Sequence, residues 1–259
     1  MRPVLFEVWG WPIHSYGLML AVAFLIGIFG VRPSAQKIGI SFDNIIDLGV
    51  WVLVGAIVGA RLAYVLTEYQ YFLKYPAEII LINSGGLAFH GGLLGGFGAG
   101  LWYVKRKRIY PWKLADIIAP FIALGYAVVR IGCLLKGCCY GKQATVFWAL
   151  PCSGNDHLLR HPTQIYSMIG SLLIFLILWK LRNHKRFPGF LFLLYIGLYS
   201  VIRFTVEFFR VAPMVFPWLS LAQLVCIILA IIAFSLIFWI DRRFNQVRSN
   251  LDAAADLNS

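Results

Sequence analysis

Long runs of hydrophobic residues recur along the whole chain, and each has about the length needed to cross a lipid bilayer. They predict seven membrane-spanning helices, at residues 16–33, 44–66, 86–104, 114–135, 163–181, 188–206 and 218–240. Little polar sequence separates these runs, so the predicted fold is all-α, with a single polytopic transmembrane domain over residues 1–248. The polar residues 249–259 are predicted to form a frayed, flexible tail.

Two segments between the runs are too polar to span a bilayer. Residues 68–83 contain Glu68, Lys74, Pro76 and Glu78 and several tyrosines, which favours an interfacial element on the outer face over a span. Residues 136–162 are predicted to form an outer loop.

Basic residues are unevenly divided between alternate connecting segments. With the N-terminus outside, 14 of the 23 lysines and arginines fall in inner segments, 6 in outer segments and 3 within spans. Because basic residues concentrate on the cytoplasmic side, this division predicts an outer N-terminus and a cytoplasmic C-terminus. The formal charge of +12 then follows from topology, and we expect no nucleic-acid partner.

Polar side chains inside the predicted spans, or directly after one, gather at one depth, near the outer leaflet. They are Tyr16, Arg61, His90, Arg130, Arg203 and Glu207. A charged group at membrane depth is costly, so each of these residues is a candidate for function. Arginine forks match phosphate oxygens in two-point contact, so this group suggests a site for an anionic phospholipid headgroup.

Structural explanations compete with function at several of these positions. Arg61 could extend its side chain to the interface, and Arg203 and Glu207 stand four residues apart, so they could form a structural ion pair. The glycines around His90, in GGLAFHGGLLGG, favour helix packing over headgroup contact. The imidazole of His90 is harder to explain by packing, because it can exchange a proton near neutral pH.

Motifs carrying these residues occur in a distinctive order. They are HSYG at 14–17, GARLAYVL at 59–66, FHGGLLGG at 89–96, ADIIAP at 115–120, VRIG at 129–132, HPTQIY at 161–166 and YSVIRFTVEFFR at 199–210. In these motifs the chain resembles the prolipoprotein diacylglyceryl transferase family. The resemblance implies transfer of a diacylglyceryl group from phosphatidylglycerol to the lipobox cysteine of a prolipoprotein, at the outer face of the inner membrane.

The resemblance also implies roles for individual residues. Arg130 would contact phosphatidylglycerol, with further substrate-binding candidates in Arg61, Gly91, Gly92 and Gly141. The catalytic candidates are His90, Arg203, Glu207, Tyr199 and Tyr16. As a hypothesis, Arg130 and Arg203 hold the phosphate, His90 takes the proton of the substrate thiol, and Glu207 orients Arg203 or His90.

One stretch departs from the family pattern. Where the family usually has NFxNGE, residues 133–141 read CLLKGCCYG, so Cys133 replaces the expected asparagine and Cys138 the expected acid. A disulfide from Cys138 or Cys139 to Cys152 is one interpretation, and an altered active site is another. No CxxC pair is present, so we expect no metal, and no fingerprint of a cofactor appears.

Two functions other than transfer remain open from the sequence. A divergent paralogue, or a lipid-binding or transport protein, could use the same basic pocket. A transporter would ordinarily place its polar site near the midplane of the membrane, in repeated halves or broken helices, and neither feature is evident.

Overall fold

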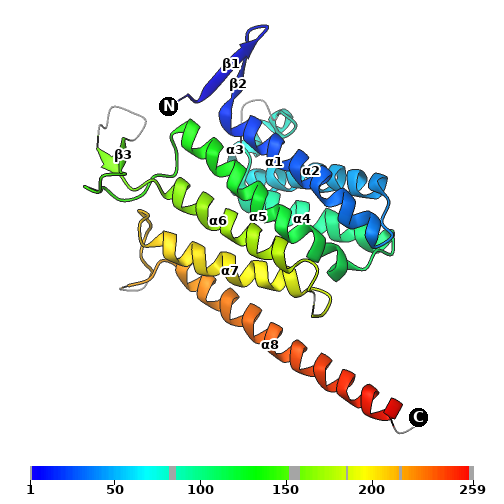
Figure 1. Ribbon diagram of the computed structural model, residues 1–259. Coiled ribbons are helices and arrows are strands. Elements are labelled where there is room, and N and C mark those ends of the chain that lie inside the picture. The colour runs from blue at the N-terminus through cyan, green and yellow to red at the C-terminus, as the bar shows by residue number, and fades with distance from the viewer. Residues whose placement is uncertain (1, 82–85, 152–157, 185, 216–217, 257–259) are drawn as a thin grey trace. The chain divides into compact units, whose positions relative to one another are not determined.

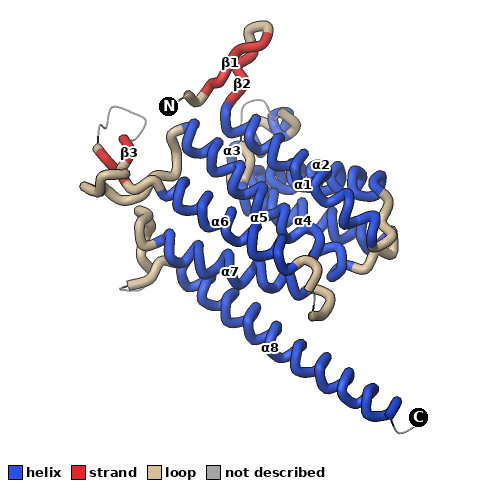
Figure 2. Tube along the Cα trace, viewed as in Figure 1, coloured by secondary structure: helices blue, strands red, loops and turns tan. Residues whose placement is uncertain are grey.

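The computed structural model describes residues 2–81, 86–151, 158–184, 186–215 and 218–256. Helices make up most of this chain, as the ribbon and the tube both show (Figures 1 and 2). The chain divides into two compact units, one of residues 31–114 and one of residues 1–30 with 115–259.

The larger unit begins with a hairpin that the hydrophobic pattern did not predict. Strands β1 (Val4–Val8) and β2 (Trp11–His14) are antiparallel, and Trp9 and Gly10 form the turn with positive φ. The helices of this unit are most of α1 (Ser15–Lys37), nearly all of α5 (Pro111–Lys136), and α6 (Thr163–Leu181), α7 (Phe190–Glu207) and α8 (Leu221–Asp256). Two short strands, β3 (Leu150–Pro151) and β4 (Leu159–Arg160), pair within the predicted outer loop.

A buried carboxylate holds the start of α7 against α5. Asp116 is 1% exposed, and its side chain accepts hydrogen bonds from the backbone N–H groups of Gly189 (2.9 Å), Leu191 (2.9 Å) and Phe192 (3.2 Å). These are donors at the beginning of a helix, which have no partner within the helix itself. A core of apolar side chains from α5, α6 and α7 lies beside them, including Ala119 and Ile174.

Asp116→Ala should destabilise the larger unit. The change leaves three buried or half-buried N–H groups without their acceptor, and we expect a loss of about 2–3 kcal/mol in the free energy of unfolding. Thermal denaturation in detergent checks this against Asp43→Ala, since Asp43 is an exposed acid in the first turn of another helix. Equal melting temperatures for the two variants would contradict the capping role.

The smaller unit is built on a close pair of helices. It contains α2 (Phe42–Thr67), the short helix α3 (Tyr69–Lys74), the 3₁₀ turn η1 (Pro76–Ile79) and α4 (Phe89–Arg106). A Cβ atom added to Gly55, Gly59, Gly91 or Gly95 would collide with backbone of the facing helix. Small residues four apart on both helices therefore let their backbones touch.

Gly95→Ala should separate this helix pair. Its new Cβ would strike the carbonyl oxygen of Gly55, whereas a Cβ at Gly98 on the same helix would meet nothing within 4 Å. We expect Gly95→Ala to cost about 1–3 kcal/mol and Gly98→Ala to be neutral or slightly stabilising. Melting temperatures of the two purified variants test the difference, and a stable Gly95→Ala protein would contradict the packing described.

Six helices are long and apolar enough to cross a membrane: α1, α2, α5, α6, α7 and residues Leu221–Phe244 of α8. The last has a mean hydropathy of 2.8 with only 17% of its window buried, so its apolar side chains face outward, as they do when lipid is the solvent. The chain is thus an all-α, multi-pass membrane protein. The predicted span at 86–104 forms the helix α4, but among the described residues it is not one of these six.

Two predicted segments outside the spans can be compared with the structure, and only the second differs from it. The described part of residues 68–83, which ends at residue 81, contains only the short α3 and η1 and no spanning helix. Helix α8 continues to Asp256, well into residues 249–259, where we expected a frayed tail.

Candidate functional site

A tight turn at the end of α5 carries the cysteine-rich stretch. Gly137 has a φ of +77°, and the N–H of Cys138 reaches back to the carbonyl of Cys133 at 3.1 Å. This is the pattern of a Schellman cap, in which a left-handed glycine ends the helix and reverses the chain. The reversal brings Cys138 and Cys139 back beside Cys133.

The start of α6 holds this turn in place. The Thr163 hydroxyl donates to the carbonyl of Cys139 at 2.7 Å, and the Gln164 amide donates to the carbonyl of Cys138 at 2.6 Å. Both side chains are 1% exposed. The HPTQIY motif therefore positions the cysteine loop through two buried side-chain bonds.

Gly141 follows at a point where three segments meet. Its N–H donates to the carbonyl of His161 at 2.9 Å, and a Cβ here would strike the carbonyl of Phe209 and lie 2.8 Å from the Thr163 methyl group. We predicted Gly141 as a substrate-binding residue. The geometry favours a packing role, because only glycine leaves room for these neighbours.

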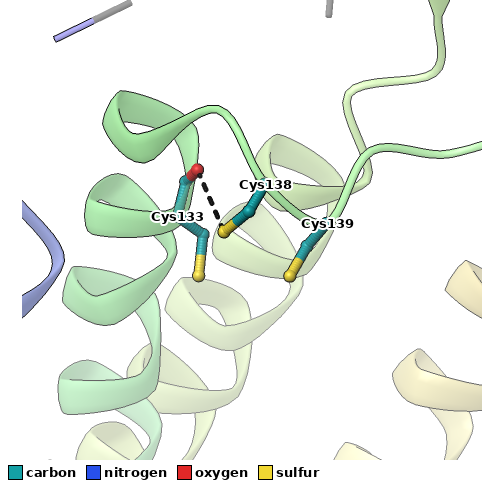
Figure 3. A group of neighbouring side chains, drawn as sticks. All are labelled: Cys133, Cys138 and Cys139. Carbon is teal, nitrogen blue, oxygen red and sulfur yellow. Dashed lines mark hydrogen bonds between the residues drawn. The ribbon is translucent and has the colours of Figure 1, made fainter. Parts of the chain in front are cut away.

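Three thiols converge on the inner side of the turn (Figure 3). The Sγ atoms of Cys133, Cys138 and Cys139 all lie within 4.8 Å of one another. Cys133 is buried, Cys138 is half-buried and Cys139 is exposed. All three are free thiols among the described residues. Cys152, the partner in the possible disulfide with Cys138 or Cys139, lies outside the described residues, so that disulfide stays an interpretation.

Cys139 is the member of this group with thiolate character. Hydrogen bonding from Cys133 lowers its pKa to about 5, against the opposing effect of burial. Cys138 and the guanidinium groups of Arg130 and Arg210 also lower this pKa, which places two arginines in the electrostatic environment of the thiol group.

Arg130 lies one helical turn before Cys133, stacked on a tyrosine. Its Cζ is 4.5 Å from the ring centroid of Tyr126, and its Nη2 donates to the Tyr126 hydroxyl. The ring of Tyr126 in turn meets Tyr199 of α7 edge-on, with centroids 5.4 Å apart. The Nε of Arg130 is buried and has no hydrogen-bond partner in the part of the chain that the structure describes.

A second basic group lies at the end of α7. The carboxylate of Glu207, 4% exposed, accepts from Arg203 and lies 3.5 Å from the Nε of Arg210. Ser220, before α8, donates to its other oxygen at 3.3 Å. The predicted Arg203–Glu207 pair therefore forms, and one buried carboxylate orients two arginines.

Tyr16 opens α1 next to the end of α5. The helices approach closely at Gly132, where a Cβ would lie 3.1 Å from the Cα of Tyr16. The ammonium of Lys136 lies 5.6 Å from the Tyr16 ring centroid, and the tyrosine is partly exposed. Tyr16 thus joins the end of α5 that carries Cys133.

Arg61, predicted as a substrate-binding residue, makes hydrogen bonds to backbone carbonyl groups. In the smaller unit its guanidinium donates to four carbonyl groups of the segment after α3. The four acceptors are Glu78 (2.5 Å), Ile79 (2.9 Å), Leu81 (2.8 Å) and Gly86 (3.0 Å). Since these bonds occupy most of its donors, the geometry favours a structural clamp over phosphate binding.

His90 is exposed in the first turn of α4, with the ring of Phe89 beside it at 5.6 Å. Gly91 and Gly92, which we predicted to bind substrate, face α2 instead. A Cβ at Gly91 would strike Gly59, and one at Gly92 would lie 3.3 Å from the carbonyl of Ala56. The helix packing that we weighed against headgroup contact thus accounts for both glycines.

Comparisons with known proteins show which family the chain belongs to. Residues 3–239 match the family described as prolipoprotein diacylglyceryl transferase. The chain belongs to this family. Relatives named phosphatidylglycerol–prolipoprotein diacylglyceryl transferase include one from Campylobacter hominis, 32% identical, with 95% of this chain and 96% of that protein covered. Relatives of the same name come from Clostridium tetani, 36% identical, with 82% of this chain and 87% of that protein covered, and from Geobacter sulfurreducens, 35% identical, with 80% and 82% covered in the same order.

Several residues of the site were missed in the sequence. Tyr126 precedes Arg130 by one helical turn, and this spacing alone could have indicated the contact. Arg210 ends the YSVIRFTVEFFR motif and could have been added to the Arg203–Glu207 pair by its i,i+3 spacing. No local signal reveals Ser220 or Gln164, because their partners lie in other segments.

Proposed function

We propose that this protein transfers the diacylglyceryl group of phosphatidylglycerol to the thiol of a prolipoprotein's lipobox cysteine. The family to which it belongs supports this proposal. So do relatives that are named for this activity and that the chain matches over most of their length. The proposal makes the protein a transferase that acts in the first step of lipoprotein maturation, with phosphatidylglycerol and lipobox-bearing signal peptides as its substrates.

The observation that carries the proposal is the buried Nε of Arg130, a donor that meets no acceptor among the described residues. A buried, unsatisfied donor is costly unless a ligand satisfies it. A phosphodiester presents two oxygens to such a group, and the cation stays charged at any working pH. Arg130 is therefore the proposed anchor of the phosphatidylglycerol phosphate, and Arg203 supplies further positive charge.

The proposed reaction forms one bond and breaks one bond. The substrate thiolate attacks the carbon of the diacylglycerol moiety that bears the phosphate. A C–S bond forms, and the C–O bond between that carbon and the phosphate breaks, with its electron pair leaving on glycerol phosphate. Arg130 and Arg203 stabilise that leaving group. The imidazole of His90 takes the thiol proton, Glu207 holds Arg203 in position, and the hydroxyls of Tyr16 and Tyr199 orient the headgroup.

The proposed topology has seven spans in the cytoplasmic membrane, with α4 as the third. Glycines make α4 less apolar than the others, but they allow it to pack against α2. The excess of basic residues in alternate segments supports an outer N-terminus. The exposed Trp9 and Trp11 of the hairpin suit an outer interface, where tryptophan concentrates.

Release of glycerol phosphate tests the function. Purified protein in detergent is incubated with phosphatidylglycerol and a lipobox peptide, beside a peptide with serine in place of the cysteine. We expect release only with the thiol peptide and none above background from Arg130→Ala. Equal release with both peptides would indicate lipid hydrolysis, and no release from folded protein would overturn the proposal.

A further inference from the structure

The trithiol group, Cys133, Cys138 and Cys139, has a geometry that the proposed reaction does not use. A tetrahedral zinc ion binds sulfur at about 2.3 Å, which places neighbouring sulfurs about 3.8 Å apart. The three Sγ atoms already lie within 4.8 Å of one another, so small side-chain rotations would bring them to this spacing. The C-x4-C-C spacing argued against a metal, but the turn at Gly137 brings the three thiols together.

The loop that carries the thiols is held in a fixed position, as the ligands of a metal ion need to be. The Schellman turn fixes Cys138 against Cys133, and the buried side chains of Thr163 and Gln164 hold the carbonyls of Cys139 and Cys138. Outer contacts of this kind orient metal ligands and limit their motion. A loop that served only as a connection would not need two buried side-chain bonds to successive carbonyls.

Three ligands leave one position of a tetrahedral ion open. Within the described residues, no fourth His, Cys, Asp or Glu joins the group. The exposure of the thiols rises from the buried Cys133 to the exposed Cys139, so one side of the group is accessible. Structural zinc sites are closed by four protein ligands, whereas catalytic zinc sites keep a position for substrate.

The surrounding charge suits a trithiolate zinc complex. Zinc with three thiolates carries one net negative charge. Arg130 lies one helical turn before Cys133 on α5, and the backbone of Arg210 pairs with that of Gly141, two residues after Cys139. Cationic side chains beside the complex would offset that charge. Arg130 is also the proposed anchor of the lipid phosphate, so the metal and the lipid phosphate would be neighbours.

We propose that Cys133, Cys138 and Cys139 bind one zinc ion whose open position takes the acceptor thiol of the prolipoprotein. This inference rests on the proposed function for the identity of the fourth ligand. Zinc binding displaces the thiol protons of the three cysteines, and coordination of the acceptor sulfur releases its proton to the base. The zinc-bound thiolate then attacks the glycerol carbon, and the thioether product, which is a weaker ligand, leaves the metal.

Cobalt(II) provides a direct probe of the site, because thiolate-bound tetrahedral cobalt absorbs visibly while zinc does not. The full-length protein, reduced and freed of metal, is titrated with Co²⁺ in detergent. We expect one Co²⁺ per chain, with thiolate-to-cobalt charge-transfer bands that Zn²⁺ removes. Cys139→Ser should lose the bands, while Cys226→Ala, a buried free thiol in α8, should keep them.

The acceptor peptide then tests the open position. A lipobox peptide with a free cysteine should shift the visible cobalt bands, and the serine peptide should not. The inference is overturned if Co²⁺ produces no thiolate bands, if the bands persist when all three cysteines are serine, or if Cys152→Ser removes them. It is also overturned if the thiol peptide leaves the spectrum unchanged.

Activity separates this inference from the function on which it rests. Removal of the metal should reduce thiol-dependent glycerol phosphate release by about 100-fold, the size expected when activation of a nucleophile is lost, and Zn²⁺ should restore it. Full release from metal-free protein would overturn the zinc inference and leave the transferase function standing. Cobalt bands that respond to the thiol peptide, with no release under any condition, would overturn the transferase function instead.

Discussion

Arg130→Lys should lower glycerol phosphate release by about 100-fold or more, even though the positive charge is retained. Lysine cannot present two parallel donors to a phosphate, and it cannot replace the guanidinium stacked on Tyr126. Loss of one well-placed donor to a developing anion typically costs 10²- to 10³-fold in rate. Steady-state release with saturating lipobox peptide measures the effect, and kcat should fall more than KM rises.

Arg186→Lys is the matched control for this substitution. Arg186 pairs with Asp241 at 3.0 Å and its side chain is 59% exposed, so the pair contributes little to stability. We expect this variant to retain the activity of the unaltered protein. An Arg130→Lys protein with more than about a tenth of that activity would contradict phosphate anchoring by the guanidinium fork.

Gly141→Ala should remove most activity without unfolding the helices. The added methyl group would collide with the carbonyl of Phe209 and press on Thr163, which holds the cysteine loop through the carbonyl of Cys139. Overpacking of this kind costs about 1–3 kcal/mol and displaces the segments that meet there. Arg210 directly follows Phe209 and Arg203 precedes it on α7, so a shift of Phe209 would move both arginines. We therefore expect about a 100-fold loss of glycerol phosphate release.

Circular dichroism and the release assay together distinguish displacement from unfolding. The far-ultraviolet spectrum of Gly141→Ala should keep its helical form while activity falls. Gly27→Ala is the control, because a Cβ at Gly27 in α1 would meet nothing within 4 Å. An active Gly141→Ala protein would show that the clash is relieved without moving the site.

Much of the fold was predictable because hydrophobic length is a strong signal in a membrane protein. The six most apolar helices lie where the runs predicted them. Helix α4, over the predicted run at 86–104, is not one of these six, and the glycines that pack it against α2 also lower its hydropathy. The hairpin of β1 and β2 was missed, because strands of five and four residues are too short to appear in a pattern read for spans.

The site was predictable where partners share a helix and hidden where they do not. Arg203 and Glu207 are separated by one turn, and their contact follows from that spacing. Arg61 appeared as another phosphate ligand because its carbonyl partners lie 17 to 25 residues away, and nothing in the local sequence indicates them. Asp116 was quoted within a motif, but its role at the start of α7 depends on a contact across 73 residues or more.

The cysteines were the least predictable part. Their spacing fits no familiar metal or disulfide pattern, so the sequence alone left several interpretations open. The left-handed turn at Gly137 decides the geometry, because it reverses the chain and places Cys138 and Cys139 beside Cys133. A backbone conformation at one glycine thus determines which side chains can act together.

The mass of the acceptor peptide after reaction shows whether the protein transfers a diacylglyceryl group to the cysteine thiol. A lipobox peptide is incubated with the purified protein and phosphatidylglycerol of defined acyl chains, and the product is examined by mass spectrometry with fragmentation. We expect a gain of one diacylglyceryl group, carried on the cysteine sulfur, with none on the serine peptide. An unmodified cysteine peptide from folded, phosphatidylglycerol-loaded protein would contradict it.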